Sequence, residues 1–330
     1  MNTAIRLERL SKRFRCTQAL DNVSVEVPEG SVFALLGENG AGKTTAIRIM
    51  LGLERPDSGH ATVLGLNCMN EGLEIRNRVG YVPEMPNLYD WMTVHQIGWF
   101  ACGFHKEGYW DRFTQLAAEF KLSPKTKIRN LSKGMRAKVS LSLALAHDPD
   151  LLILDEPTSG LDAMVRREFL ESMVERAATG RTVFLSSHQI NEVERVAEYV
   201  ALIRKGKLAL VARLDDLKLR TRVLSMTVAG TAISPSLPDG RLVDERREGR
   251  RIQWVVEGMA ENRLGELKEQ SGVESLDVHA PSLEEIFVAH MQGNGGVKKI
   301  NGDTNNDVYS FDSDVASRSA DGSGLGEVRS

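Results

Sequence analysis

The chain has 330 residues and a net charge of −3 at neutral pH, with 42% hydrophobic and 26% charged side chains, an ordinary composition for a globular protein. Because the charge is slightly negative, the composition does not point to nucleic acid, and we expect no nucleic-acid partner. No apolar run approaches the roughly 20 residues that span a bilayer, and the N-terminal segment lacks the apolar core of a signal peptide, so any membrane channel is expected to be another chain.

The first predicted elements are β-strands that lead into a glycine-rich loop. An antiparallel β segment is predicted from IRLERL, NVSVEV and SVFALL, and the pattern Gly37-x-x-x-x-Gly42-Lys43-Thr44 follows, before the helix-like AIRIML. Backbone N–H groups of such a loop bind phosphate, Lys43 can reach the β- and γ-phosphates, and the Thr44 hydroxyl can bind Mg²⁺. The residues expected to bind nucleotide here are Gly37, Glu38, Asn39, Gly40, Ala41, Gly42, Lys43, Thr44 and Thr45.

Helical periodicity replaces the strand pattern over about residues 85–147. The aromatic residues of this segment, among them Trp91, Trp99 and Trp110, are either part of a contact surface or, as aromatic stripes more often are, part of a core. The segment continues into LSKGM (residues 131–135) and the helix-like RAKVSLSLALA. By itself, Leu-Ser-x-Gly also suits an ordinary helix cap.

The sequence LLILDE predicts a buried strand that ends in two carboxylates. A continuous apolar run is typical of a parallel strand that is buried on both faces. Buried charge needs compensation, and Mg²⁺ bound to ATP would supply it. We expect Asp155 to hold the metal through water and Glu156 to act as the general base for the attacking water. A further β-like run, TVFLSS, places His188 at the carboxyl edge of the same sheet, where ligands bind in such folds.

These motifs, in this order, resemble those of the ATP-binding subunit of an ABC transporter. GENGAGKTT, LSKGM, LLILDEPTSGLD and His188 match the family's phosphate loop, signature, acidic strand with D-loop, and switch histidine. The resemblance implies that Ser132 and Gly134 bind the γ-phosphate of the ATP held by an opposite subunit. Two positions depart from the usual LSGGQ, with Lys133 in place of glycine and Met135 in place of glutamine.

The resemblance also implies roles for four further residues. Asp162 belongs to the loop that crosses the dimer interface, and His188 orients Glu156 and water at the γ-phosphate. Glu84 stands where the family has glutamine, and a metal contact is carried over to it, with slower or differently coupled hydrolysis as a consequence. Phe14 is the candidate for stacking on adenine, with a place in the core as an equally open alternative.

The pattern changes again near residue 220. Residues 1–219 are predicted to form the ATPase domain, 220–292 a compact accessory α/β domain, and 293–330 a disordered tail, because the last segment is rich in Gly, Ser, Asn and Asp. VLSMTVAG, RIQWVVEG and VESLDVHA suggest strands of the accessory domain. The final PSLEEIFVAHM resembles the end of the accessory domain found in ATPases that serve separate six-span exporter permeases.

The fold class expected from all this is an α/β P-loop NTPase of the ABC type. The resemblance implies two such subunits, most simply a homodimer, which close head to tail on ATP and Mg²⁺ at the cytoplasmic face of a cell membrane and drive a separate permease. One alternative is a soluble ABC ATPase that acts on ribosomes or DNA. Another is a subunit that hardly hydrolyses ATP, which the presence of Glu156 and His188 disfavours.

Overall fold

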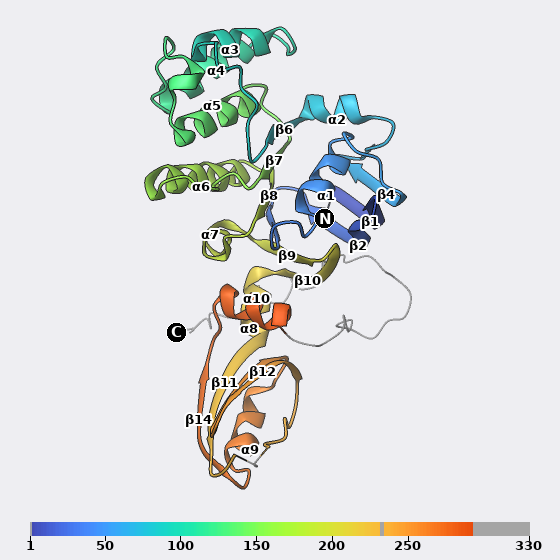
Figure 1. Ribbon diagram of the computed structural model, residues 1–330, viewed down its shortest axis with the longest axis vertical. Coiled ribbons are helices and arrows are strands. Elements are labelled where there is room, and N and C mark those ends of the chain that lie inside the picture. The colour runs from blue at the N-terminus through green and yellow to red at the C-terminus, as the bar shows by residue number, and fades with distance from the viewer. Residues whose placement is uncertain (1, 232–233, 293–330) are drawn as a thin grey trace, which may run out of the picture.

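The computed structural model describes residues 2–231 and 234–292 (Figure 1). The predicted disordered tail, 293–330, lies outside the described residues. In the part of the chain that is described, no helix is both long enough and apolar enough to cross a bilayer.

The N-terminal strands form an antiparallel sheet with the order β2-β1-β4-β5. Its strands are β1 (Thr3–Phe14), β2 (Thr17–Pro28), β4 (Ser58–Val63) and β5 (Leu66–Asn67). The expectation that SVFALL belongs to this sheet is wrong. That run forms a strand of the neighbouring parallel sheet, because its residues are buried on both faces, as parallel strands usually are.

The central sheet has the order β10-β9-β3-β8-β7-β6, and it is parallel except for β10. Its strands are β3 (Val32–Leu36), β6 (Val79–Val82), β7 (Leu151–Asp155), β8 (Thr182–Ser187), β9 (Tyr199–Arg204) and β10 (Lys207–Arg213). Every residue of β3, β7 and β8 is buried. The carboxyl ends of these three strands therefore deliver their loops to one edge of the sheet.

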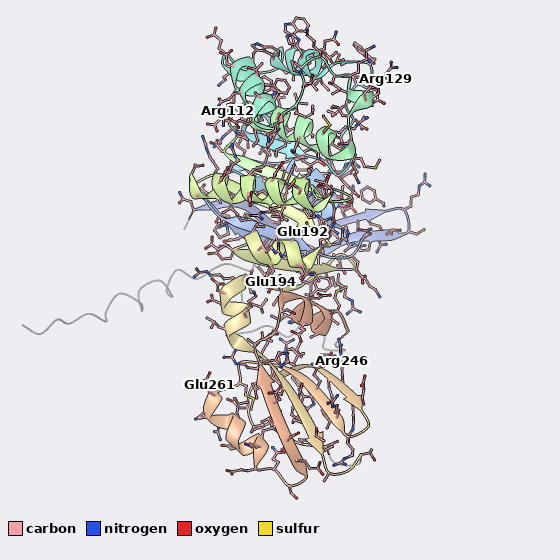
Figure 2. The ribbon with its side chains drawn as sticks, turned by 90° about the vertical axis from the view of Figure 1, so that its left-hand side faces the viewer. Arg112, Arg129, Glu192, Glu194, Arg246 and Glu261 are labelled. Atoms are coloured by element: carbon pink, nitrogen blue, oxygen red, sulfur yellow. The ribbon has the colours of Figure 1, made fainter. Side chains whose placement is uncertain are left out.

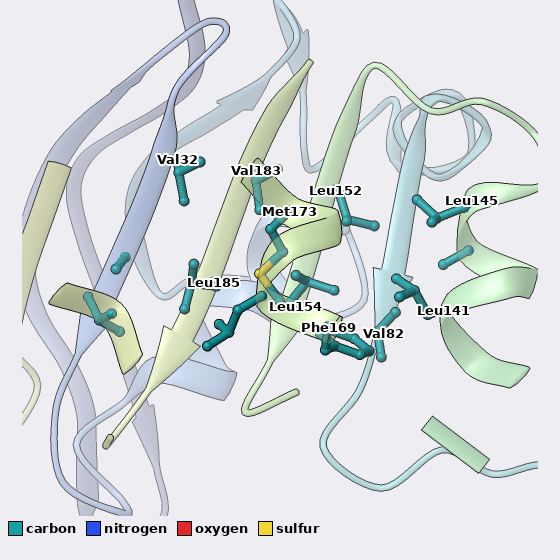
Figure 3. Close-up of a cluster of buried hydrophobic side chains, with 14 of the residues drawn as sticks. Val32, Val82, Leu141, Leu145, Leu152, Leu154, Phe169, Met173, Val183 and Leu185 are labelled. Atoms are coloured by element: carbon teal, nitrogen blue, oxygen red, sulfur yellow. The ribbon is translucent and has the colours of Figure 1, made fainter. Parts of the chain in front are cut away.

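Helices cover both faces of the central sheet. On one face, Phe169 and Met173 of α6 (Ala163–Ala178) pack on Leu152, Leu154 and Val183 (Figure 3). The other face is buried against α1 (Lys43–Met50) and the antiparallel sheet, where Phe33 and Phe184 stack at 5.7 Å. The remaining helices around this sheet are α2 (Gly72–Arg78) and α7 (Ile190–Val196).

A helical group lies at one end of the molecule (Figure 1). It consists of α3 (Val94–Cys102), α4 (Tyr109–Glu119), a 3-10 turn (Ile128–Asn130) and α5 (Lys133–Leu145). These elements fall within the segment that periodicity predicts to be helical. Thr93 caps α3 through a capping box with Gln96, which explains where this helix begins.

The C-terminal part lies at the opposite end and has its own antiparallel sheet, in the order β12-β13-β11-β14 (Figure 1). Its elements are α8 (Leu214–Arg220), β11 (Thr221–Val228), β12 (Arg241–Glu248), β13 (Arg251–Glu257), a 3-10 turn (Glu261–Arg263), α9 (Leu264–Lys268), β14 (Val273–His279) and α10 (Leu283–Gln292). The charged strand β12 is absent from the predicted elements, because RLVDERRE has no apolar alternation to reveal it.

Candidate functional site

The glycine-rich loop joins the end of β3 to the start of α1, as its sequence predicts. Gly40 and Gly42 have positive φ angles of 79° and 112°, and a Cβ on Gly42 would lie 2.3 Å from the carbonyl oxygen of Ala19. Only glycine fits the second position. Gly37 N–H donates to the carbonyl of Ser187 at 3.3 Å, so the loop lies at the carboxyl end of β8. Residues 38–40 are exposed, which leaves the loop accessible to a nucleotide.

Lys43 is the centre of a buried polar group. Its Nζ donates to the carbonyl oxygens of Gly37 (2.7 Å) and Glu38 (3.2 Å), and it lies 2.9 Å from Glu156 Oε1. The Lys43 and Glu156 side chains are only 5% and 6% exposed. Because a buried ammonium needs a buried counter-charge, the pairing explains how both are tolerated.

Glu156 joins this lysine to His188. Its Oε2 lies 2.7 Å from His188 Nδ1, and the backbone N–H of His188 donates to the same oxygen at 3.3 Å. Its Oε1 forms the ion pair with Lys43 Nζ and accepts no other hydrogen bond within the described residues. Glu156 has a φ of 49°, a left-handed conformation that is costly for a residue with a side chain. No pattern in the sequence indicates this backbone strain.

Ser186 is a site residue that sequence reasoning missed. Its hydroxyl donates to Asp155 Oδ1 at 2.6 Å and accepts from the N–H of Glu156 at 3.1 Å. It therefore ties the carboxylate of Asp155 and the backbone of Glu156, at the carboxyl end of β7, to the neighbouring strand β8. The signal available in the sequence was a pair of serines at the end of the apolar run TVFLSS. Burial, and to a smaller extent the charge of Asp155, raises the pKa of nearby Tyr81 to about 12.

The three predicted metal ligands do not form a closed protein cage. Asp155 is buried, whereas Thr44 and Glu84 are exposed. Among the described residues, no group of three or more His, Cys, Asp or Glu side chains is arranged to hold a metal ion. Carboxylate and hydroxyl oxygens nevertheless suit Mg²⁺, which usually takes only one or two protein ligands and is held mainly by the phosphates of a nucleotide.

The signature segment begins a helix and touches the segment around Asp162. Ser132 caps α5, since its hydroxyl accepts from the N–H of Met135 at 3.2 Å. Asp162 caps α6 in the same way, accepting from the N–H groups of Met164 and Val165. A Cβ on Gly160 would lie 2.4 Å from Lys133 Nζ, so the two loops are in contact within one chain. Gly134 is buried against Val165.

Phe14 lies on the surface, which rules out the core alternative. It is 44% exposed at the end of β1, and Lys12 Nζ lies 5.0 Å from the centre of its ring. The ring is thus free to take a planar partner on the face that the lysine does not cover.

An exposed aromatic surface lies on the helical group. Its members are exposed side chains between the end of β6 and the residues just after α3. Two of the three tryptophans named from the sequence, Trp91 and Trp99, are among them. The third, Trp110, is partly buried and packs against the hydrophobic core. We define this surface by the exposed side chains of this stretch of the chain, namely Met85, Tyr89, Trp91, Trp99, Phe100 and Phe104. Tyr89 contacts Trp91 and Phe100, with ring centres 6.1 and 5.6 Å apart, and Phe104 continues the row.

A cleft of about 720 Å³ opens beside this surface, between the helical group and the central sheet. It is lined by Thr44 of the phosphate-loop helix, by His105, Tyr109 and His147, and by five residues that follow β6, namely Pro83, Met85, Pro86, Asn87 and Leu88. His105 stacks on both Tyr109 and His147, at 4.4 and 4.7 Å. The cleft therefore extends from Thr44 at the candidate nucleotide site to Met85, which is also a member of the exposed surface.

Comparison with known proteins places these features in one family. A sequence model described as "ABC transporter" matches residues 20–159. The chain is 35% identical to the bacitracin transport ATP-binding protein of Bacillus licheniformis, over 67% of this chain and 74% of that protein. It is 32% identical to a daunorubicin resistance ATP-binding protein of Streptomyces coeruleorubidus, over 86% of this chain and 94% of that protein.

Solved structures agree with the fold. The structure of an ATP-binding subunit of an ABC transporter aligns with a TM-score of 0.61 and 31% identity, covering 66% of this chain and 92% of that one. A dimeric ATP-binding cassette bound to ADP and phosphate after hydrolysis aligns with a TM-score of 0.59 and 22% identity, over 64% of this chain and 98% of that one. At this identity the second likeness shows the fold alone.

Proposed function

Since the chain belongs to the ATP-binding subunits of ABC transporters and is an ATPase, we propose that it powers export through a separate membrane permease, at the cytoplasmic face of the membrane. Two copies would close head to tail on ATP, and residues 220–292 would form an accessory domain beside the ATPase domain of residues 1–219. The names of relatives that act in bacitracin transport, daunorubicin resistance and Nod factor export support export and disfavour a ribosome- or DNA-bound ATPase.

In the proposed reaction, Glu156 takes a proton from the attacking water and His188 fixes the orientation of its carboxylate. The Oε1 of Glu156, which is ion-paired with Lys43 in this structure, would become the acceptor, and the 2.7 Å contact with His188 holds the other oxygen. Lys43 would exchange its contact with Glu156 for the phosphates of ATP. Mg²⁺, held by Thr44, Asp155 and Glu84, would neutralise the phosphate charge.

The dimer would complete each nucleotide site with residues of the second copy. Ser132 is exposed at the N-terminus of α5, where backbone N–H groups favour an anion, and Gly134 lies in the first turn of that helix. Lys133 of this segment lies close to Gly160, two residues before Asp162, which caps α6. Phe14 would stack on adenine. After hydrolysis the γ-phosphate no longer joins the two copies, and the dimer would open.

The observation that carries the permease contact is the exposed aromatic surface beside the cleft. Trp91, Trp99 and Phe104 are 64%, 69% and 71% exposed, and clustered apolar side chains on a surface are typical of protein interfaces. The cleft and the row of rings are suited to an amphipathic helix, which buries spaced anchors in a groove. A permease helix in this position would touch the segment that carries Glu84 and would sense the nucleotide.

Copurification tests the proposal. Tagged wild-type protein, Trp99→Glu, and a control variant, Leu219→Glu, which alters a 68% exposed residue of α8, are isolated from detergent-solubilised native membranes, and bound proteins are identified by mass spectrometry. We expect a six-span membrane protein with the wild type and with Leu219→Glu, and little of it with Trp99→Glu. Ribosomal or DNA-repair proteins without a permease would overturn the proposal.

A further inference from the structure

Helix α7 begins two residues after His188, and one of its side chains reaches the turn that follows Glu156. Glu192 Oε2 accepts a hydrogen bond of 2.5 Å from the hydroxyl of Thr158. Both residues are buried, with exposed fractions of 8% and 3%. A buried carboxylate is costly unless it is paired or hydrogen-bonded. The bond from Thr158 therefore supplies part of what keeps Glu192 in this buried position.

The same carboxylate also holds the start of α6. Glu192 Oε1 lies 2.9 Å from Arg166 Nε, and Arg166 Nη2 donates to the carbonyl of Leu161 at 2.9 Å. The intervening turn is short and tight, because Ser159 N–H donates to the carbonyl of Glu156 and Leu161 N–H donates to that of Thr158, both at 3.1 Å. Only Pro157 separates Glu156 from Thr158. A displacement of Thr158 is therefore passed directly to Glu156.

The C-terminal part holds the opposite side of α7. Glu194 Oε1 accepts from Lys218 Nζ of α8 at 2.6 Å and from the N–H of Leu283 at the start of α10 at 3.3 Å. Leu283 and Ile286 are fully buried in the cluster that covers the central sheet. In Figure 2, Glu192 lies towards the ATPase core and Glu194 next to the C-terminal helices. Helix α7 is thus held from both sides.

We propose that Glu192 is a positioning residue for ATP hydrolysis. It fixes the turn after Glu156 to the helix after His188, and the C-terminal helices keep α7 in place through Glu194. The two members of the catalytic pair, Glu156 and His188, follow different strands, β7 and β8, and the Glu192–Thr158 bond joins the segments beyond both strand ends. The inference rests on the proposed catalytic role of Glu156. Its physical basis is that misplacement of a reacting group by about 1 Å can lower a rate by roughly 100-fold.

The test compares four variants of the full-length chain. Glu192→Leu and Thr158→Val each remove the bond, Glu192→Gln keeps an acceptor for the Thr158 hydroxyl, and Glu171→Gln, which alters an exposed carboxylate of α6, is the control. Turnover per nucleotide-binding site, the KM for ATP and the melting temperature are measured. In Glu192→Leu and Thr158→Val we expect kcat to fall about tenfold or more, with KM changed less than about twofold. Glu192→Gln should keep most of the wild-type kcat.

A second arm tests the outer contact. Glu194→Gln weakens the ion pair with Lys218 and the bond to Leu283, and we expect kcat to fall about two- to fivefold, since α10 remains packed in the core. Thr158→Val keeps the side-chain volume, so it remains informative if Glu192→Leu does not fold.

Glu156→Gln separates the positioning role of Glu192 from the catalytic role of Glu156. If Glu156→Gln is inactive while Glu192→Leu and Thr158→Val keep kcat within about twofold, the positioning role is wrong and the catalytic role stands. An active Glu156→Gln would overturn both. If KM rises while kcat and the melting temperature fall together in Glu192→Leu and Thr158→Val, the contact is merely structural and the inference is overturned.

Discussion

Two buried glutamates, at different places in this chain, each pair with a histidine. In the ATPase core, Glu156 and His188 are 2.7 Å apart, and in the C-terminal part, Glu257 and His290 are 3.0 Å apart. Both carboxylates are buried, at 6% and 8% exposure. The histidines differ, since the side chain of His188 is 41% exposed and that of His290 is 7% exposed. The first pair can meet a ligand, whereas the second is closed off.

The surroundings of the two pairs differ in the same way. Glu156 follows a strand end, has a left-handed backbone and is ion-paired with Lys43 of the glycine-rich loop. Glu257 ends β13 in an ordinary strand, and its histidine belongs to α10, so the pair joins this helix to the C-terminal sheet. A buried Glu–His pair is therefore no evidence of catalysis by itself. Access, backbone strain and a phosphate loop nearby distinguish the two.

The largest predicted difference is in nucleotide affinity. Lys43→Ala removes the ammonium that the phosphates need, and we expect the Kd for ATP to rise at least about 100-fold, which equals the loss of one or two charge-assisted hydrogen bonds. The matched change at the second pair is Arg241→Ala, since Arg241 lies 3.8 Å from Glu257. It should leave the Kd within about twofold. Titration of wild type and of each variant with a fluorescent ATP analogue provides the measurement. Equal affinities in all three proteins would show that the site of the first pair does not bind the nucleotide.

The second prediction concerns stability. His290→Leu leaves Glu257 buried with a weakened set of partners, and we expect the free energy of unfolding to fall by about 2–4 kcal/mol. His188→Leu should cost less than about 1 kcal/mol, because His188 is partly exposed and Glu156 keeps Lys43. Urea denaturation of both variants checks this. If His188→Leu lowers the free energy of unfolding more than His290→Leu does, Glu257–His290 is not the pair that mainly stabilises the fold.

The third prediction concerns how the stabilising effect of His290 depends on pH. Burial alone would raise the pKa of Glu257, but the hydrogen bond and charge of His290 lower this pKa below its ordinary 4.5. A lowered pKa in the folded state contributes stability that is complete above pH 4.5 and is lost as the pH falls through the folded value. The difference in unfolding free energy between wild type and His290→Leu should therefore shrink below pH 4.5. If urea denaturation gives a constant difference down to about pH 3, His290 is not what lowers this pKa.

The smallest predicted effect comes from a third set of histidines, in the cleft. Burial, and then the neighbouring His105, lowers the pKa of His147 from 6.5 to about 4. Because the unfolded chain binds a proton more readily, stability is complete above pH 6.5 and falls as the pH is lowered towards 4. The slope is at most about 1.4 kcal/mol per pH unit. His147→Phe should flatten it in thermal melts, and an unchanged slope would exclude His147 as its source.

The sequence was more informative about the first pair than about the second. Continuous apolar runs predicted β3, β7 and β8, and the loop at Gly37–Thr45 predicted the nucleotide site, because those patterns follow from burial and from phosphate chemistry. The approach of Glu156 to Lys43 and the role of Ser186 depend on side-chain directions at strand ends, which no pattern records. The catalytic and dimer roles of the site residues stay predictions.

In the C-terminal part the sequence predicted less of the structure. Alternating runs predicted β11 and β13, but β12 is charged along its length and carries no such signal. Nothing in PSLEEIFVAHM indicated that Leu283 and Ile286 would be buried in the core of the ATPase rather than in their own sheet. Such packing depends on the arrangement of two distant segments. The periodicity of a single helix does not determine it.

One measurement tests the contrast between the pairs most directly: turnover and melting temperature of Glu156→Gln and Glu257→Gln, side by side. We predict that Glu156→Gln loses about 100- to 10,000-fold in kcat, as expected for a general base, and also melts lower, because Lys43 loses its buried counter-charge. Glu257→Gln should keep kcat within about threefold and melt several degrees lower. A Glu156→Gln protein that hydrolyses ATP at the wild-type rate would contradict the catalytic role of the first pair.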